Sequence, residues 1–140
     1  MIFEEKTLKS ERIYEGTILN LRRDEVTVLH GTSYREIVEH NGGAVLAALT
    51  DEGKMVMVRQ FRKPAERVML EVPAGKIDPG EKPEETAKRE LAEETGYRAR
   101  HVQYLTEFYP SVGYAEEVLY LYLCTGLTPG ETNFDENEAI

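Results

Sequence analysis

One segment of this 140-residue chain constrains the fold more than any other: residues 83–95, with the sequence PEETAKRELAEET. It consists largely of strong helix formers, Pro83 suits the first helical turn, and Gly96 is a typical C-terminal stop. Runs rich in β-branched and aromatic residues lie on both sides of it. The sequence therefore predicts an α/β fold in which a helix covers a sheet, with Ala87 and Leu91, spaced i and i+4, facing that sheet.

The flanking runs predict strands that are separated by turn sequences. A polar turn at residues 30–33 joins two of them into an expected hairpin. The loop at 73–82 holds two Gly and two Pro and cannot continue a strand. The predicted strands cover residues 17–21, 25–29, 34–39, 44–49, 55–58, 68–72, 102–108 and 118–124.

Composition and charge exclude several classes of protein. With 41% hydrophobic residues the chain has enough apolar material for one core. Its longest apolar runs are far shorter than the roughly 20 residues of a membrane helix, so no membrane partner is expected. The net charge of −9 disfavours nucleic acid as a partner. Cys124 is the single cysteine and the N-terminus lacks a secretory pattern, which indicates a cytoplasmic location.

Three carboxylates crowd one side of the predicted helix. Glu90, Glu93 and Glu94 are spaced three and four residues apart, and like charges at that spacing destabilise an isolated helix. Arg89 relieves only part of this repulsion. A hard divalent cation, Mg²⁺, Mn²⁺ or Ca²⁺, would neutralise the cluster, and Mg²⁺ commonly binds carboxylates together with substrate phosphates. The alternative is an ordinary solvated helix face.

The spacing around this helix matches a longer pattern. Particular residue types stand at fixed spacings over the 23 residues 75–97. They are Gly75, Glu81, Arg89, Glu90, Leu91, Glu93, Glu94, Gly96 and Tyr97. The pattern resembles the Nudix box at every defining position. That resemblance implies a Nudix fold, a mixed β-sheet flanked by helices, and hydrolysis of a diphosphate linked to a nucleoside, with Mg²⁺, or Mn²⁺ in its place. By the same likeness the metal ligands are Glu90, Glu93, Glu94 and the carbonyl of Ala74, and Glu81 with Arg89 orients them.

Flanking segments narrow the resemblance to the ADP-ribose pyrophosphatases. Residues 59–62 (RQFR), 71–75 (EVPAG) and 34–40 (YREIVEH) resemble segments of that subgroup, so the likeness covers nearly the whole chain. It implies cleavage of ADP-ribose to AMP and ribose 5-phosphate. The substrate contacts that it implies are Arg35, Arg62, Glu71 and Glu117.

The acidic tail resembles the catalytic loop of the same enzymes. Within residues 134–138 (FDENE), the likeness implies that Glu136 is a general base and that Glu138 is an additional metal ligand. Glu93 is the alternative base. The expected catalytic residues are therefore Glu136, Glu93 and Arg89.

The resemblance also implies how the chain is divided. Residues 1–41 are expected to form an N-terminal antiparallel β region that mediates a homodimer, and residues 42–140 a Nudix catalytic domain that stops short of the family's usual C-terminal strand and helix. Val112 stands where the subgroup usually has Pro. Three alternatives therefore stay open: another nucleoside diphosphate derivative as substrate, a nucleotide-sensing module without turnover, or an acidic interaction domain.

Overall fold

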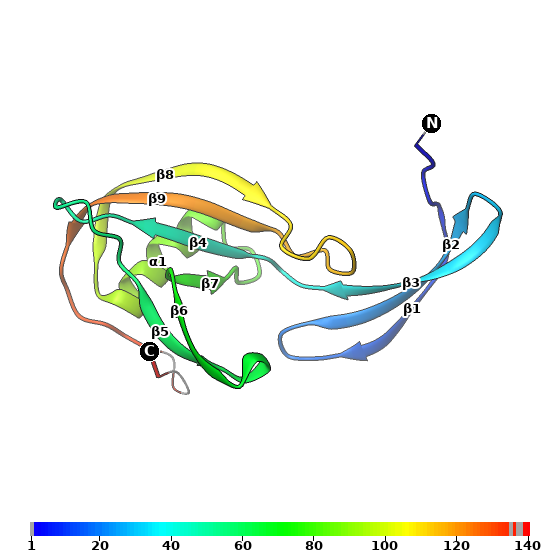
Figure 1. The fold of residues 1–140 in the computed structure, drawn as a ribbon, viewed down its shortest axis with the longest axis horizontal. Coiled ribbons are helices and arrows are strands. Elements are labelled where there is room, and N and C mark those ends of the chain that lie inside the picture. The colour runs from blue at the N-terminus through cyan, green and yellow to red at the C-terminus, as the bar shows by residue number, and fades with distance from the viewer. Residues whose placement is uncertain (1, 135, 137–138) are drawn as a thin grey trace. The chain divides into compact units, whose positions relative to one another are not determined.

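The chain forms two compact units in the computed structural model, which describes residues 2–134, 136 and 139–140 (Figure 1). Unit 1 contains the residues up to 42 together with residues 109–118. Unit 2 contains residues 43–108 and the chain from residue 119 onward. The chain therefore leaves unit 1 and returns to it once.

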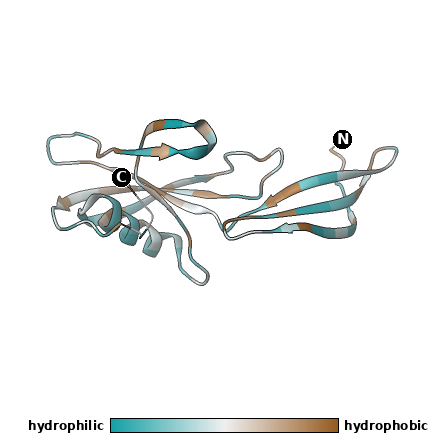
Figure 2. Cartoon of the chain, turned by 90° about the horizontal axis from the view of Figure 1, so that it is seen from below, coloured by the Kyte–Doolittle hydropathy of each residue, from teal (hydrophilic) through white to brown (hydrophobic). Residues whose placement is uncertain are grey.

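Unit 1 is built on a three-stranded antiparallel sheet in the order β1-β2-β3. Its strands are β1 (Thr7–Glu15), β2 (Asn20–Val28) and β3 (Gly31–Glu39). The predicted hairpin is confirmed as β2–β3, which closes at the pair Val28↔Gly31. Figure 2 shows hydrophobic and hydrophilic segments interspersed along these strands.

Two sequence predictions in this unit are wrong. Residues 17–19 do not form a strand, because Gly16 N donates to Leu19 O at 3.0 Å and closes a turn there, and residues 20–21 belong to β2. Strand β1 was not predicted, since most of its residues are polar and every one of them is exposed. Its backbone pairing with β2, rather than burial of side chains, holds it in the sheet.

The loop 109–118 pairs with β3. Val38 N donates to Tyr114 O at 2.7 Å, and Glu116 N donates to Val38 O at 3.0 Å. This pairing explains why the loop belongs to unit 1 although strands of unit 2 lie on both sides of it in the sequence.

Unit 2 contains a four-stranded mixed sheet in the order β7-β4-β9-β8. The strands are β4 (Gly43–Ala48), β7 (Ala74–Lys76), β8 (Arg98–Phe108) and β9 (Leu119–Thr128). β4 runs parallel to β9 and antiparallel to β7, and β8 runs antiparallel to β9.

A separate two-stranded ribbon consists of β5 (Val58–Arg62) and β6 (Arg67–Glu71), joined by the short 3-10 helix η1 (Lys63–Ala65). Two predictions in unit 2 are wrong. Residues 73–82 are not loop throughout, because residues 74–76 pair with β4 as β7. The strand predicted at 55–58 does not form over those residues. Met55 forms only an isolated bridge with Leu49, and the strand begins at Val58.

The helix α1 (Pro83–Thr95) has the predicted bounds. Lys82 N donates to the Glu85 carboxylate at 3.0 Å at its start, and Gly96 ends it with a φ of +74°. Ala87 and Leu91 are 0% and 1% exposed and join a core cluster with residues of β4 and β9, as predicted. The predicted α/β class is confirmed. No helix among the described residues has the length and apolar character to cross a membrane.

Candidate active site

The centre of the site is the guanidinium of Arg89 on α1. Its Nε and Nη2 donate to the two carboxylate oxygens of Glu81 at 2.9 and 3.0 Å, a bidentate pair. Glu81 also accepts from the buried hydroxyl of Thr86 at 2.7 Å. These donors lower the pKa of Glu81 to about 2, with the Arg89 hydrogen bonds as the largest cause. Glu81 is therefore a fixed anion at any physiological pH, and it orients Arg89.

The remaining nitrogen of Arg89 lies between two of the predicted metal ligands. Arg89 Nη1 donates to Glu90 at 2.7 Å and to Glu93 at 2.9 Å. These carboxylates raise the pKa of Arg89 further above its ordinary value, after the larger effect of Glu81. A positive charge thus sits against the acidic cluster that the sequence predicted.

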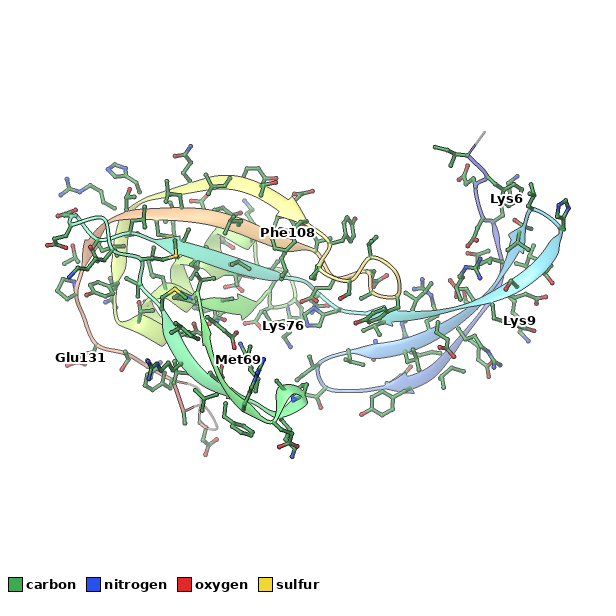
Figure 3. The ribbon with its side chains drawn as sticks, viewed as in Figure 1. Lys6, Lys9, Met69, Lys76, Phe108 and Glu131 are labelled. Carbon is green, nitrogen blue, oxygen red and sulfur yellow. The ribbon has the colours of Figure 1, made fainter. Side chains whose placement is uncertain are left out.

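The third carboxylate of the cluster is fixed by the backbone of β7. Glu94 is 6% exposed, and its Oε2 accepts from Ala74 N at 3.2 Å. Glu90 approaches the same strand so closely that a Cβ on Gly75 would lie 1.8 Å from its carboxyl carbon. Gly75 is therefore required here because it leaves room for this carboxylate. Lys76, labelled in Figure 3, ends the strand and accepts from Arg89 Nη2 at 3.3 Å through its carbonyl.

The donor set of these residues fits a hard divalent cation. Carboxylate oxygens come from Glu90, Glu93 and Glu94, and a backbone carbonyl is available at Ala74. Among the described residues, no three His, Cys, Asp or Glu side chains form a ready metal-binding group. Binding a cation here would therefore require Arg89 to release at least part of its hold on Glu90 and Glu93.

Two of the expected substrate contacts form a pair within unit 2. Arg62 on β5 donates through Nε and Nη2 to the two oxygens of Glu71 on β6, both at 2.8 Å. This arrangement lowers the pKa of Glu71. Arg62 is the last residue of β5 and precedes η1, whereas Glu71 is the last residue of β6 and directly precedes the turn into β7.

The other two expected substrate contacts, Arg35 and Glu117, belong to unit 1. Arg35 on β3 forms a bidentate pair with Glu5 in the segment before β1. Glu117 lies with its Oε1 3.6 Å from Nδ1 of His40.

The tail approaches α1 near the acidic cluster. Asn133 N donates to the carbonyl of Glu93 at 2.9 Å and thereby satisfies an acceptor in the last turn of the helix. The tail also passes Gly96, where an added Cβ would lie 2.6 Å from Gly130 O. Glu136 is exposed, three residues beyond Asn133. The predicted ligand Glu138 lies outside the described residues.

Sequence reasoning missed three participants: Thr86, Asn133 and Glu5. Thr86 could have been found, because a hydroxyl in the first turn of a helix commonly binds a preceding acceptor. Asn133 acts through its backbone N–H and leaves no side-chain pattern. Glu5 lies 30 residues from its partner Arg35, so no local spacing indicates the pair.

Known proteins similar to this chain identify its family. The NUDIX domain profile matches residues 40–140. The methanol dehydrogenase activator of Bacillus methanolicus is 46% identical over 99% of this chain and 77% of its own length. The ADP-ribose pyrophosphatase of Bacillus subtilis strain 168 is also 46% identical, over 98% of this chain and 76% of its own length.

A solved structure described as an ADP compounds hydrolase superposes with a TM-score of 0.85 at 22% identity, and covers 99% of this chain and 76% of its own. At that identity the superposition supports the fold. The domain profile covers most of the chain, and the two relatives align along nearly all of it. The predicted family is thus confirmed: the chain belongs to the NUDIX domain family.

Proposed function

We propose that this protein is a Nudix pyrophosphohydrolase that cleaves ADP-ribose to AMP and ribose 5-phosphate, with Mg²⁺ as its metal and Mn²⁺ as a substitute. The observation that carries the proposal is the network on α1, in which Glu81 and Arg89 hold two carboxylates of the acidic cluster while the backbone of β7 holds the third. The 46% identical relative from Bacillus subtilis is named for the same activity.

Each residue of the acidic cluster has a proposed role. Glu90, Glu94 and the Ala74 carbonyl hold the cation, and Glu93 contributes a further carboxylate. The cation, when bound, stabilises negative charge on the phosphoryl oxygens and brings an anionic substrate to an acidic helix. Arg89 orients the carboxylates, because Glu81 fixes its guanidinium from the opposite edge.

Glu136 is the proposed general base. It accepts a proton from the water whose oxygen attacks a phosphorus of the diphosphate, and the P–O–P bond breaks to leave two monophosphates. It lies three positions beyond Asn133, whose backbone N–H binds the Glu93 carbonyl. Three extended residues span at most about 11 Å, so the tail can bring Glu136 to the acidic cluster. Glu93 is the alternative base, and Glu138 is the proposed additional ligand.

Arg62 and Arg35 are proposed to bind the substrate through their guanidinium forks, which match phosphate oxygens. Glu71 and Glu117 are proposed as further substrate contacts. Glu71 also fixes the orientation of Arg62 through the two 2.8 Å hydrogen bonds.

A homodimer is the proposed assembly, with residues 1–41 as its N-terminal β region and residues 42–140 as the catalytic domain. Exposed apolar side chains on unit 1 support a contact with a second copy of the chain. They include Leu8, Ile13, Tyr14 and Ile18. A cytoplasmic location is also proposed, because Cys124 is a buried free thiol of the kind that a reducing compartment preserves.

The deciding experiment is product analysis of the purified protein against ADP-ribose, nucleotide sugars, dinucleotides, oxidised nucleotides and nucleoside triphosphates with Mg²⁺. We expect the highest kcat/KM for ADP-ribose. A tenfold preference for another diphosphate, about 1.4 kcal/mol in transition-state stabilisation, would make that compound the substrate class. Binding of nucleotides without any turnover would instead identify a sensing module.

Loss of activity after chelation and its return with Mg²⁺ or Mn²⁺ tests the metal. Glu94→Gln keeps the shape of the side chain and removes one charge, so its turnover at limiting Mg²⁺ should fall. Undiminished turnover of this variant at limiting Mg²⁺ would contradict the metal assignment.

A further inference from the structure

Arg35 does not present a vacant binding edge, because a carboxylate of the same chain already occupies it. Arg35 Nε donates to Glu5 Oε2 at 2.9 Å, and Nη2 donates to Glu5 Oε1. The third nitrogen, Nη1, donates to the Tyr34 carbonyl at 3.0 Å and to the Ser33 hydroxyl at 3.3 Å. The planar fork that suits two phosphate oxygens is thus the one that Glu5 holds.

We infer that Glu5 is an internal competitor for this fork, which a phosphate ligand displaces on binding, so that Glu5 sets the affinity of the chain for the diphosphate. The inference rests on the proposed role of Arg35 in binding the substrate. A carboxylate and a diphosphate need the same two N–H groups, so the two cannot be bound there together.

The position of Glu5 suits an exchangeable group. It precedes β1, and the backbone of the next residue, Lys6, is fixed to β2: Thr27 N donates to Lys6 O at 2.9 Å, and Lys6 N donates to the Thr27 hydroxyl at 2.9 Å. Lys6 is labelled in Figure 3. The segment is therefore anchored beside the arginine, while the Glu5 side chain can swing away without unpairing the sheet.

The surroundings leave room for a ligand. Glu5 and Arg35 line a cavity of about 730 Å³ within unit 1, together with Arg22, Tyr34 and residues of the loop 112–116. The side chains of Arg35 and Glu5 are 42% and 38% exposed. Water and ions reach the pair, so its disruption costs little and the competition is weak enough to be reversible.

The charge state favours competition at neutral pH. The hydrogen bond from Arg35 lowers the pKa of Glu5, which therefore stays ionised. Glu5→Gln keeps the size of the side chain but removes the charge that holds the fork. Glu4→Gln is a matched control, since Glu4 is the exposed neighbour that carries the same charge.

The test measures KM and kcat for ADP-ribose, and the Kd of inorganic pyrophosphate by calorimetry, for both variants and the unmodified chain. We expect Glu5→Gln to lower both KM and Kd by about two- to fivefold with kcat unchanged, the scale of an exposed ion pair. Glu4→Gln should change neither. In an Arg35→Lys background, which lacks the guanidinium fork, Glu5→Gln should lower neither KM nor Kd.

Three outcomes would overturn the inference: equal KM and Kd for Glu5→Gln and the unmodified chain, weaker binding by Glu5→Gln, or an equal gain in the Arg35→Lys background. Weaker binding would mean that Glu5 positions the arginine for its ligand. These outcomes are separable from failure of the proposed function. If ADP-ribose is not cleaved, the pyrophosphate titration still reports whether Glu5 competes for Arg35.

Discussion

At the scale of single residues, Arg89 connects Glu81 to two carboxylates of the acidic cluster. It pairs with Glu81 on one side and with Glu90 and Glu93 on the other. Its removal would leave three carboxylates without their shared counter-ion. The loss of Arg89 is expected to cost more stability at Glu81 than at Glu90 and Glu93, because a divalent cation can neutralise only the carboxylates of the acidic cluster.

Arg89→Gln is therefore expected to destabilise the protein by about 1–3 kcal/mol, the cost of removing a charged hydrogen-bond donor from partly buried carboxylates. Urea unfolding with chelator and with Mg²⁺ measures it, and Mg²⁺ should restore part of the loss. Lys88→Gln is the control, since Lys88 pairs with Glu84 at the exposed surface and its loss should cost under about 0.5 kcal/mol. Equal effects of both substitutions would contradict the central role of Arg89.

Glu81 makes the stability depend on acid pH. Its pKa is lowered from 4.5 to about 2, so its contribution is fully present above about pH 5 and disappears as the pH falls towards 2. At most about 3.5 kcal/mol is involved, since the pKa falls from 4.5 to about 2 and one pKa unit corresponds to about 1.4 kcal/mol. Glu81→Gln should be less stable at pH 7 and should show a flatter decline between pH 5 and 2. Parallel curves for the variant and the unmodified chain would refute the assignment.

At the scale of elements, the site depends on how closely α1 approaches β7. Gly75→Ala would place a Cβ 1.8 Å from the carboxyl carbon of Glu90, so this side chain must move. We expect Mg²⁺ affinity to fall at least tenfold while the circular dichroism of the fold is retained. Gly113→Ala is the control, because its Cβ would meet nothing within 4 Å. Unchanged Mg²⁺ binding by Gly75→Ala would show that Glu90 is not a ligand.

The tail forms a second contact at this scale, the hydrogen bond from Asn133 N to the Glu93 carbonyl. If Glu136 is the base, Glu136→Gln should lower kcat by about 10²- to 10⁴-fold with little effect on KM. Asn133→Pro removes the N–H and should also lower kcat, and the two losses should not add. Single-turnover kinetics at saturating Mg²⁺ measures them. Normal hydrolysis by Glu136→Gln beside a crippled Glu93→Gln would assign the base to Glu93.

At the scale of the whole molecule, apolar exposure in each unit favours self-association. The β5–β6 ribbon exposes Phe61, Val68 and Leu70, and an isolated two-stranded ribbon is marginal without further packing. We expect a homodimer in sedimentation at micromolar concentration, weakened by Phe61→Lys or Ile13→Lys. A monomer at every concentration would contradict the proposed assembly.

The helix and its acidic side could be predicted from sequence, because both depend on local residue order. Pro83, Gly96 and the i, i+4 spacing fix α1, and the box spacing identifies the family. The strands were less predictable. β1 lacks any burial signal, since all of its residues are exposed. The turn at residues 16–19 and the late start of β5 at Val58 depend on pairing partners that no short window contains.

The sequence by itself determined which residues carry charge, which side of α1 is acidic and that a glycine ends this helix. Residue order and the helical period decide these features. The box resemblance already paired Glu81 with Arg89, but only the tertiary structure decided that Arg35 holds Glu5 and that Arg62 holds Glu71. Glu81 and Arg89 lie 8 residues apart, whereas Arg35 meets Glu5 across 30 residues. Such distant pairs form because strand pairing brings the two backbone segments together. Each side chain then pairs with an opposite charge that its length allows it to contact.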